Sequence, residues 1–140
     1  LRADQGQVFA VEKKDDAVAL LYENKQRFAA DNLEIIKGEA PEALKELPVP
    51  THAFIGGSSG NLKEIVALLL EKNRDVRIVI NCITLETISE ALEILKEYDF
   101  ADQEAVQLTA SRSKEIGRYH LMMGENPIYI ITCQSPRAQI

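Results

Sequence analysis

The sequence predicts an α/β fold with a mostly parallel sheet, because short apolar runs alternate with segments of helical periodicity along most of the chain. Glycine-rich or polar clusters directly follow several of these runs. Strands that alternate with helices form parallel sheets, and ligands bind beyond the carboxyl ends of the strands. We therefore expect the clusters to gather at one end of the sheet.

The first half of the chain contains two strand–helix units. Residues 7–11 form a short apolar run, and apolar residues at helical spacing follow over residues 17–28. The next run, Leu33–Lys37, ends at Gly38. Pro41 then suits the first turn of a short helix, because its φ is fixed and it has no N–H to leave unpaired.

The third unit begins with the run His52–Ile55, which is followed by the glycine-rich segment Gly56–Gly60. A helix is expected from Asn61 to Glu71, because Asn61 and Glu64 have the spacing of a capping box. The unit is therefore strand, glycine turn and helix.

The fourth unit is the most apolar part of the chain. The run Val76–Ile83 predicts a strand buried on both faces. The segment Thr84–Tyr98 predicts a helix with one apolar face, formed by Ile88, Ala91, Leu92 and Leu95.

The last part of the chain predicts a final antiparallel pair of strands. Residues 105–109 and 128–132 are β-type runs, and the polar segment 110–126 that joins them is expected to hang over one end of the sheet. We expect one domain over residues 1–134 and a mobile tail over residues 135–140.

Composition limits the class of protein. With 140 residues, 46% of them hydrophobic, the chain suits one core. A net charge of −6 disfavours nucleic acid as a partner. Cys82 and Cys133 lie in apolar runs without metal-ligand spacing, which predicts core packing in a reducing cytoplasm. No apolar stretch approaches the roughly 20 residues that cross a bilayer, so no membrane partner is expected.

Because the chain opens with Leu1, we expect it to be a fragment or a processed product.

Acidic and small residues follow the first two expected strands. Glu12 stands where a carboxylate accepts hydrogen bonds from ribose hydroxyls in nucleoside-binding folds, although a solvated surface acid is an equal alternative. The segment Gly38-Glu39-Ala40 would let a planar adenine approach the backbone, with an ordinary turn as the alternative. The two segments support each other because they recur at the same end of the sheet.

The segment Gly56–Asn61 is the most informative one. Its glycines permit close approach of a ligand and leave amide N–H groups available, while a flexible turn is the alternative interpretation. It lacks the GxxxxGK[ST] pattern of a phosphate-binding loop. After the fourth strand, capping of the helix is sufficient to explain Thr84, whereas the role of Glu86 stays open.

The final connection contains Ser111 and Arg112, and a guanidinium group matches a carboxylate well. A solvated loop is the alternative. His52 and His120 have no partner at the spacing of a nucleophile and its base, and no metal-ligand set is present in the sequence. We therefore assign no catalytic residue and no metal.

Several motifs together carry a resemblance to a known family. In order and spacing, the chain from about Gly6 to Thr132 is similar to the decarboxylating precorrin-6Y or cobalt-precorrin methyltransferases, which are class I S-adenosylmethionine-dependent enzymes with a Rossmann-like sheet. The motifs are Phe9–Lys13, Gly38–Leu44, Ile55–Asn61, Thr84–Thr87, Ala110–Arg112 and Asn126–Pro127.

The resemblance implies that this protein binds S-adenosylmethionine and methylates a tetrapyrrole in cobalamin biosynthesis, with loss of carbon dioxide. It further implies a homo-oligomer, a dimer or tetramer. The implied cofactor-binding residues are Glu12, Lys13, Gly38, Glu39, Ala40, Gly56 and Gly57. The implied substrate-binding residues are Ser58, Gly60, Asn61, Thr84, Glu86, Ser111 and Arg112.

One departure from the family matters. Such enzymes carry a first strand and a glycine-rich loop before the position of Glu12, and neither precedes it here. We therefore expect this chain alone to bind the cofactor poorly and to have impaired activity. We expect either a gap between the strands near residues 8–11 and 53–55, or re-pairing of those strands. A methyltransferase for another small molecule or a tRNA, and a non-catalytic α/β module, stay as alternatives.

Overall fold

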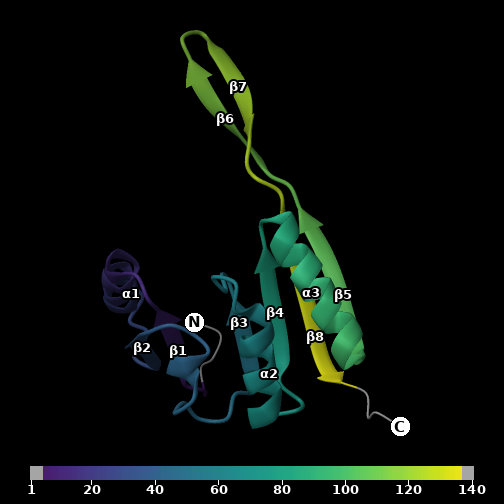
Figure 1. Cartoon of the computed structure of the whole chain (residues 1–140). Helices are drawn as coiled ribbons and strands as arrows, with labels where there is room; N and C mark the ends of the chain where they lie inside the picture. The colour runs from purple at the N-terminus through teal and green to yellow at the C-terminus, as the bar shows by residue number, and fades with distance from the viewer. Residues whose placement is uncertain (1–4, 137–140) are drawn as a thin grey trace. The chain divides into compact units, whose positions relative to one another are not determined.

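The computed structural model describes residues 5–136 and forms two compact units, Leu1–Pro48 and Val49–Ile140 (Figure 1). In the part of the chain that it describes, no helix has the length and apolar character needed to span a membrane. The assignment of residues 1–134 to a single domain stays a prediction.

The first unit is a strand–helix–strand segment followed by a short turn. Strands β1 (Val8–Glu12) and β2 (Leu33–Lys37) pair in parallel, and helix α1 (Asp15–Arg27) connects them. The expected helix after Pro41 is only the 3₁₀ turn η1 (Glu42–Leu44). Among the described residues of this unit none is buried, because one helix on two strands provides no enclosed core.

The second unit is built on a four-stranded sheet of order β3-β4-β8-β5. Strands β3 (His52–Ile55) and β4 (Arg77–Cys82) are parallel, while β8 (Ile128–Pro136) is antiparallel to both β4 and β5 (Phe100–Leu108). Strands β3, β4 and β5 therefore point in the same direction (Figure 1). The expected antiparallel pair is confirmed, although β5 begins at Phe100 rather than Ala105.

Helices α2 (Leu62–Lys72) and α3 (Leu85–Tyr98) cover one face of this sheet (Figure 1). The buried residues come from these helices, from the sheet face beneath them and from adjoining turns: Ile55, Leu62, Ile65, Val66, Leu69, Val76, Ile78, Ile80, Cys82, Ala91, Ile94, Leu95, Phe100, Ile131 and Cys133. Leu92 was expected in this core but is 53% exposed, because the buried face of α3 passes through Ile94 instead.

The opposite face of the sheet carries no helix among the described residues of the second unit. Val79 and Asn81 of β4 are half-buried there, and Phe54 of β3 is 70% exposed. The expectation that β4 is buried on both faces is therefore wrong. Ile83, expected within this strand, lies beyond its end and is 63% exposed.

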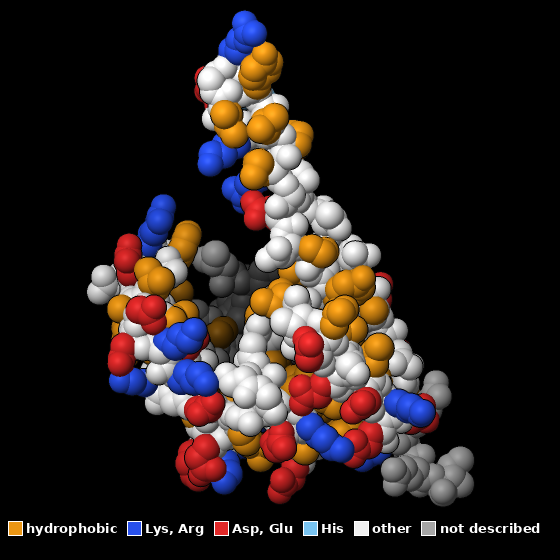
Figure 2. Space-filling view, turned by 45° about the horizontal axis from the view of Figure 1, so that its top comes forward, with side chains coloured by type: hydrophobic (Ala, Val, Ile, Leu, Met, Phe, Trp, Pro, Cys, Tyr) orange, Lys and Arg blue, Asp and Glu red, His pale blue; other side chains and the backbone are white. Residues whose placement is uncertain are grey.

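The connection between β5 and β8 is ordered. Strands β6 (Ser111–Ile116) and β7 (Tyr119–Gly124) form an antiparallel hairpin, which turns at Gly117 with φ +62°. The hairpin projects from the end of the sheet at which β5 finishes (Figure 1), and its surface carries hydrophobic and basic side chains (Figure 2). The expected location is confirmed, and the polar connection is ordered by cross-strand hydrogen bonds, which the sequence did not predict.

The strands β1 and β3 belong to separate sheets. Strand β1 pairs only with β2, and β3 pairs only with β4, among residues 5–136. Re-pairing of β1 with β3 does not occur there. The expected tail over residues 135–140 begins within β8, which continues to Pro136, and residues 137–140 lie outside the described part.

Candidate functional site

The first unit brings the predicted ribose and adenine segments together. Glu12 is the last residue of β1 and lies opposite Lys37, the last residue of β2. The N–H of Gly38 donates to the carbonyl oxygen of Glu12 at 3.0 Å. Glu12 and the segment that begins at Gly38 are therefore neighbours at the carboxyl end of two parallel strands.

The carboxylate of Glu12 uses only one of its oxygens within the fold. Its Oε1 accepts hydrogen bonds from the backbone N–H groups of Lys13 at 2.8 Å and Lys14 at 2.9 Å. These bonds orient the side chain at the entry to α1, where the N-cap residue, Lys14, makes no side-chain cap. No described residue donates to Oε2.

The side chains of Lys13 and Glu39 form an ion pair, with Nζ and Oε1 3.0 Å apart. Both are about half exposed, at 43% and 54%, and such a pair contributes little to stability. Rearranging it for a ligand would therefore cost little. A ligand group that replaced Lys13 or Glu39 in this ion pair would contact the other partner, which already lies at this end of the sheet.

Packing, as well as the predicted binding role, explains a glycine at position 38. A Cβ at this position would come within 2.8 Å of the Cβ of Ala43. Ala40, the third residue of the predicted adenine segment, leads into the turn that carries Ala43. The ordinary-turn interpretation thus accounts for the glycine itself, while Glu39 and Ala40 stay candidates for binding.

In the second unit, the segment Gly56–Asn61 joins β3 to α2. Ser59 and Gly60 both have positive φ, +53° and +87°, and the N–H of Asn61 donates to the carbonyl of Ser58 at 2.9 Å. A Cβ added at Gly57 or Gly60 would meet no atom within 4 Å. The fold requires a glycine-like conformation at Gly60, whereas no described atom fills the space beside Gly57.

The predicted capping box of α2 is wrong. Asn61 is the N-cap residue, yet its side chain makes no cap hydrogen bond, because its backbone has φ −107° and ψ 23° rather than an extended conformation. Ser58 and Asn61 stay candidates for substrate contact on the strength of the resemblance alone.

The residues after β4 have separate roles. The hydroxyl of Thr84 accepts from the N–H of Thr87 at 3.1 Å and lies 2.9 Å from the hydroxyl of Thr87, which confirms the capping interpretation. Glu86 is exposed in the first turn of α3, where the helix dipole favours an acid. Ile83 and Leu85 are 63% and 80% exposed here. Ile83 was expected in the buried strand, and no role was predicted for Leu85 beyond its place in the Thr84–Thr87 motif.

Ser111 and Arg112 lie at the base of the hairpin. They follow β5, so they are at the same end of the sheet as Gly56 and Thr84. Strand β8 separates β5 from β4, which places the hairpin base about 10 Å from the end of β4 at the usual strand spacing. Arg112 is 85% exposed, with its Nε 3.5 Å from Glu125 Oε1. The structure therefore groups these residues with the glycine segment only loosely.

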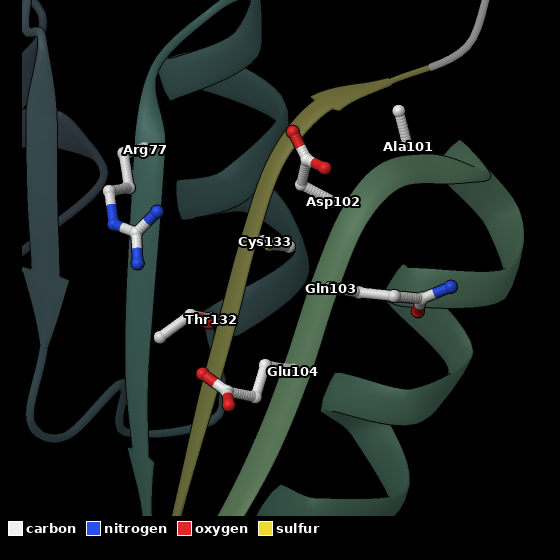
Figure 3. Close-up of a pocket in the computed structure, with 7 residues that line it drawn as sticks. All are labelled: Arg77, Ala101, Asp102, Gln103, Glu104, Thr132 and Cys133. Carbon is white, nitrogen blue, oxygen red and sulfur yellow. The ribbon is translucent and has the colours of Figure 1, made fainter.

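A polar hollow of about 370 Å³ lies at the other end of the sheet (Figure 3). Arg77, Asp102, Glu104 and Thr132 share its sheet face, as the strand register requires, whereas Gln103 and Cys133 belong to the opposite face. Arg77 opens β4, so the hollow is remote from the carboxyl ends at which the predicted residues gather. It does not coincide with the predicted site.

The two cysteines are part of the core, as predicted. Cys82 and Cys133 are buried and not in a disulfide. Burial raises the pKa of Cys133 to about 11 and also raises the pKa of Cys82, so both thiols are protonated at neutral pH. Within residues 5–136 no group of three or more His, Cys, Asp or Glu side chains could hold a metal ion.

Comparison with known proteins gives a consistent result. A family profile described as "Precorrin methyltransferase domain" matches residues 1–134. A Pyrobaculum calidifontis protein named "Probable cobalt-precorrin-6B C(15)-methyltransferase (decarboxylating)" is 35% identical over 133 residues, which are 94% of this chain and 68% of that protein.

Two crystal structures are similar as well. The precorrin-6y C5,15-methyltransferase of Geobacter metallireducens has a TM-score of 0.83 and 32% identity, covering 92% of this chain and 68% of its own. The precorrin 8W decarboxylase of Methanobacterium thermoautotrophicum has a TM-score of 0.82 and 33% identity, covering 91% and 69%. The similarity confirms the predicted α/β methyltransferase fold.

Proposed function

The chain belongs to the precorrin methyltransferase domain family, and on that premise we propose that it takes part in S-adenosylmethionine-dependent C-methylation and decarboxylation of a precorrin in cobalamin biosynthesis. The match of the family profile over residues 1–134 is the observation that carries this proposal. The acidic net charge of −6 favours a small tetrapyrrole over a tRNA as the substrate.

The first unit would hold the nucleoside part of the cofactor. Glu12 Oε2 makes no hydrogen bond to a described residue, and it would accept from the ribose hydroxyls while Oε1 keeps the side chain in place. Lys13 and Glu39 would border the adenine beside Ala40. The arrangement fits a nucleoside, because an oriented carboxylate and a small-residue segment lie side by side on neighbouring strands.

The second unit would orient the tetrapyrrole. Ser58, Gly60 and Asn61 would contact the flat ring. Gly56 and Gly57 stay cofactor-binding candidates, and the open space beside Gly57 would let a ligand approach the backbone closely. The exposed side chains of Ile83 and Leu85 would exclude water from the ring next to Glu86. Thr84 would act mainly by fixing the start of α3.

Positioning supplies most of what the reaction needs from the protein. When bound, S-adenosylmethionine supplies an electrophilic methyl group on a sulfonium. The chain would hold an electron-rich ring carbon in line with this group and away from water. For decarboxylation, the C–C bond of an acetate side chain breaks, its electron pair enters the conjugated ring and carbon dioxide leaves. We propose that Arg112 grips a substrate carboxylate.

The hairpin supports the proposal that the protein is a homo-oligomer. The register of β6 and β7 places Ile116, Tyr119, Leu121 and Met123 on one face, which also carries Arg112 and Lys114, and each of the four apolar side chains is between 48% and 59% exposed. Met122 lies on the opposite face. A two-stranded hairpin is marginally stable alone, so a second copy that covers its apolar face would stabilise both. We further propose that the protein works in the cytoplasm, in line with its reduced, buried cysteines.

The proposed reaction is tested by incubating the purified chain with methyl-labelled S-adenosylmethionine and cobalt-precorrin-6B. Mass spectrometry is expected to detect a product that has gained one methyl group and lost one carbon dioxide. A transfer RNA transcript replaces the tetrapyrrole in a parallel sample. Methylation of the RNA, with the tetrapyrrole unchanged, would contradict the proposal.

A further inference from the structure

Asn81 lies beside the glycine segment in the second unit. Ile55 of β3 pairs with Ile80 of β4, so the next residues of these parallel strands, Gly56 and Asn81, are level with each other. Ile80 and Cys82 are buried beneath the helices, and the alternation of a strand places Asn81 on the opposite face. Neither the sequence motifs nor the capping interactions account for Asn81.

The amide of Asn81 is not satisfied by the described part of the chain. Its Oδ1 is buried and accepts no hydrogen bond. A buried acceptor without a partner is costly, because it has lost its hydrogen bonds to water. In Asn73, by contrast, Nδ2 donates to the Pro50 carbonyl at 2.8 Å and Oδ1 accepts from the Asp75 N–H at 3.0 Å. The fold thus uses both ends of the Asn73 amide, whereas no described residue bonds to Oδ1 of Asn81.

The space next to Asn81 is shaped by Gly56. A Cβ on Gly56 would lie 3.2 Å from Cε1 of Phe54, so the Phe54 ring extends along the strand toward the glycine on the uncovered face of the sheet. Phe54 is 70% exposed. An aromatic ring, a position without a side chain and an unpaired amide therefore lie together near the carboxyl ends of β3 and β4.

We propose that Asn81 is a substrate-positioning residue whose amide oxygen accepts a hydrogen bond from a pyrrole N–H of the tetrapyrrole; this inference rests on the proposed function. Ionised carboxylates of the tetrapyrrole have no proton to donate to this oxygen. The ammonium group of the cofactor would have to give up its hydration beside an uncharged amide, which is unfavourable. A pyrrole N–H is an uncharged donor on a flat ring, and it matches both the amide and the neighbouring aromatic side chain.

The test compares Asn81→Leu with Asn73→Leu in the full chain. Leucine has the same branching of heavy atoms, although its methyl groups are larger, and it has no acceptor. If Asn81 has no structural partner, Asn81→Leu keeps or raises the melting temperature. We expect the Kd for cobalt-precorrin-6B, followed by its visible absorbance, to rise about ten-fold, and the Kd for S-adenosylhomocysteine to change by less than about two-fold. The control Asn73→Leu is expected to lower the melting temperature.

Three outcomes would overturn the inference. A loss of thermal stability in Asn81→Leu as large as that in Asn73→Leu would make Asn81 structural. Weaker binding of S-adenosylhomocysteine, with tetrapyrrole binding intact, would place Asn81 at the cofactor. Equal affinities of the wild type and Asn81→Leu for the tetrapyrrole would reject the inference while leaving the proposed function standing, whereas a wild-type chain that binds no tetrapyrrole would reject both.

Discussion

Replacing Glu12 tests the cofactor site of the first unit. Glu12→Ala is expected to weaken the binding of S-adenosylhomocysteine by about 1 to 3 kcal/mol, the usual value of hydrogen bonds to a charged group. Only Oε2 is left for the ribose, because Oε1 already accepts from Lys13 and Lys14. Glu12→Gln keeps one carbonyl oxygen for the two backbone bonds but places an amide NH2, which is a donor, where Oε2 would accept from the ribose. It loses this acceptor as well as the charge, so it should weaken binding by about as much as Glu12→Ala, by about 1 to 3 kcal/mol.

The same structure separates this effect from a loss of stability. The N–H groups of Lys13 and Lys14 belong to exposed residues, so water replaces the lost bonds and Glu12→Ala should cost only about 0.5 to 1 kcal/mol of unfolding free energy. Isothermal titration calorimetry measures the affinities. Asp16→Ala is the matched control, because Asp16 also accepts from a backbone N–H, at 2.9 Å, but has no assigned ligand. Equal affinities of the wild type and Glu12→Ala would refute the ribose assignment.

Three other perturbations follow from the structure. Gly38→Ala should lower the unfolding free energy by about 1 to 3 kcal/mol, because the new Cβ would overpack against Ala43. Gly57→Ala should leave thermal stability unchanged and weaken ligand binding. A Gly57→Ala variant less stable than Gly38→Ala would contradict this account of the packing. Light scattering should give at least a dimer of the 15.6 kDa chain. Leu121→Asp should dissociate it, whereas Met122→Asp, on the opposite face of the hairpin, should not, and a monomeric wild type would contradict the proposed contact through the hairpin. Folding raises the pKa of Cys133 from 9.0 to about 11, so the unfolded chain loses this proton at a lower pH than the folded chain does. The unfolding free energy should therefore fall between pH 9.0 and about 11, by up to about 1.4 kcal/mol per pH unit. Urea titrations in which the unfolding free energy of Cys133→Ala falls with pH as steeply as that of the wild type would contradict this.

The sequence by itself determined the local elements and the family. The runs Leu33–Lys37 and His52–Ile55 are strands with the predicted bounds, because each is flanked by turn-forming residues that stop the hydrogen-bond ladder. The motifs around Glu12, Gly56 and Thr84 were sufficient to predict the family, because a family is recognised by the types of its residues and by their spacing. Local patterns indicate the secondary-structure propensity of a segment, and this propensity was enough to predict these two strands.

Only the tertiary structure decided what lies against each segment. Periodicity placed Leu92 and Ile83 in the core, but the position of the helices on one face of the sheet leaves both exposed. The sequence predicted residues 110–126 only as a polar connection, and the pairing of β6 with β7 makes this segment a hairpin. Asn81 is an ordinary strand residue until the burial of Oδ1 is known. Burial and satisfaction of hydrogen bonds depend on non-local neighbours, which a one-dimensional pattern does not contain.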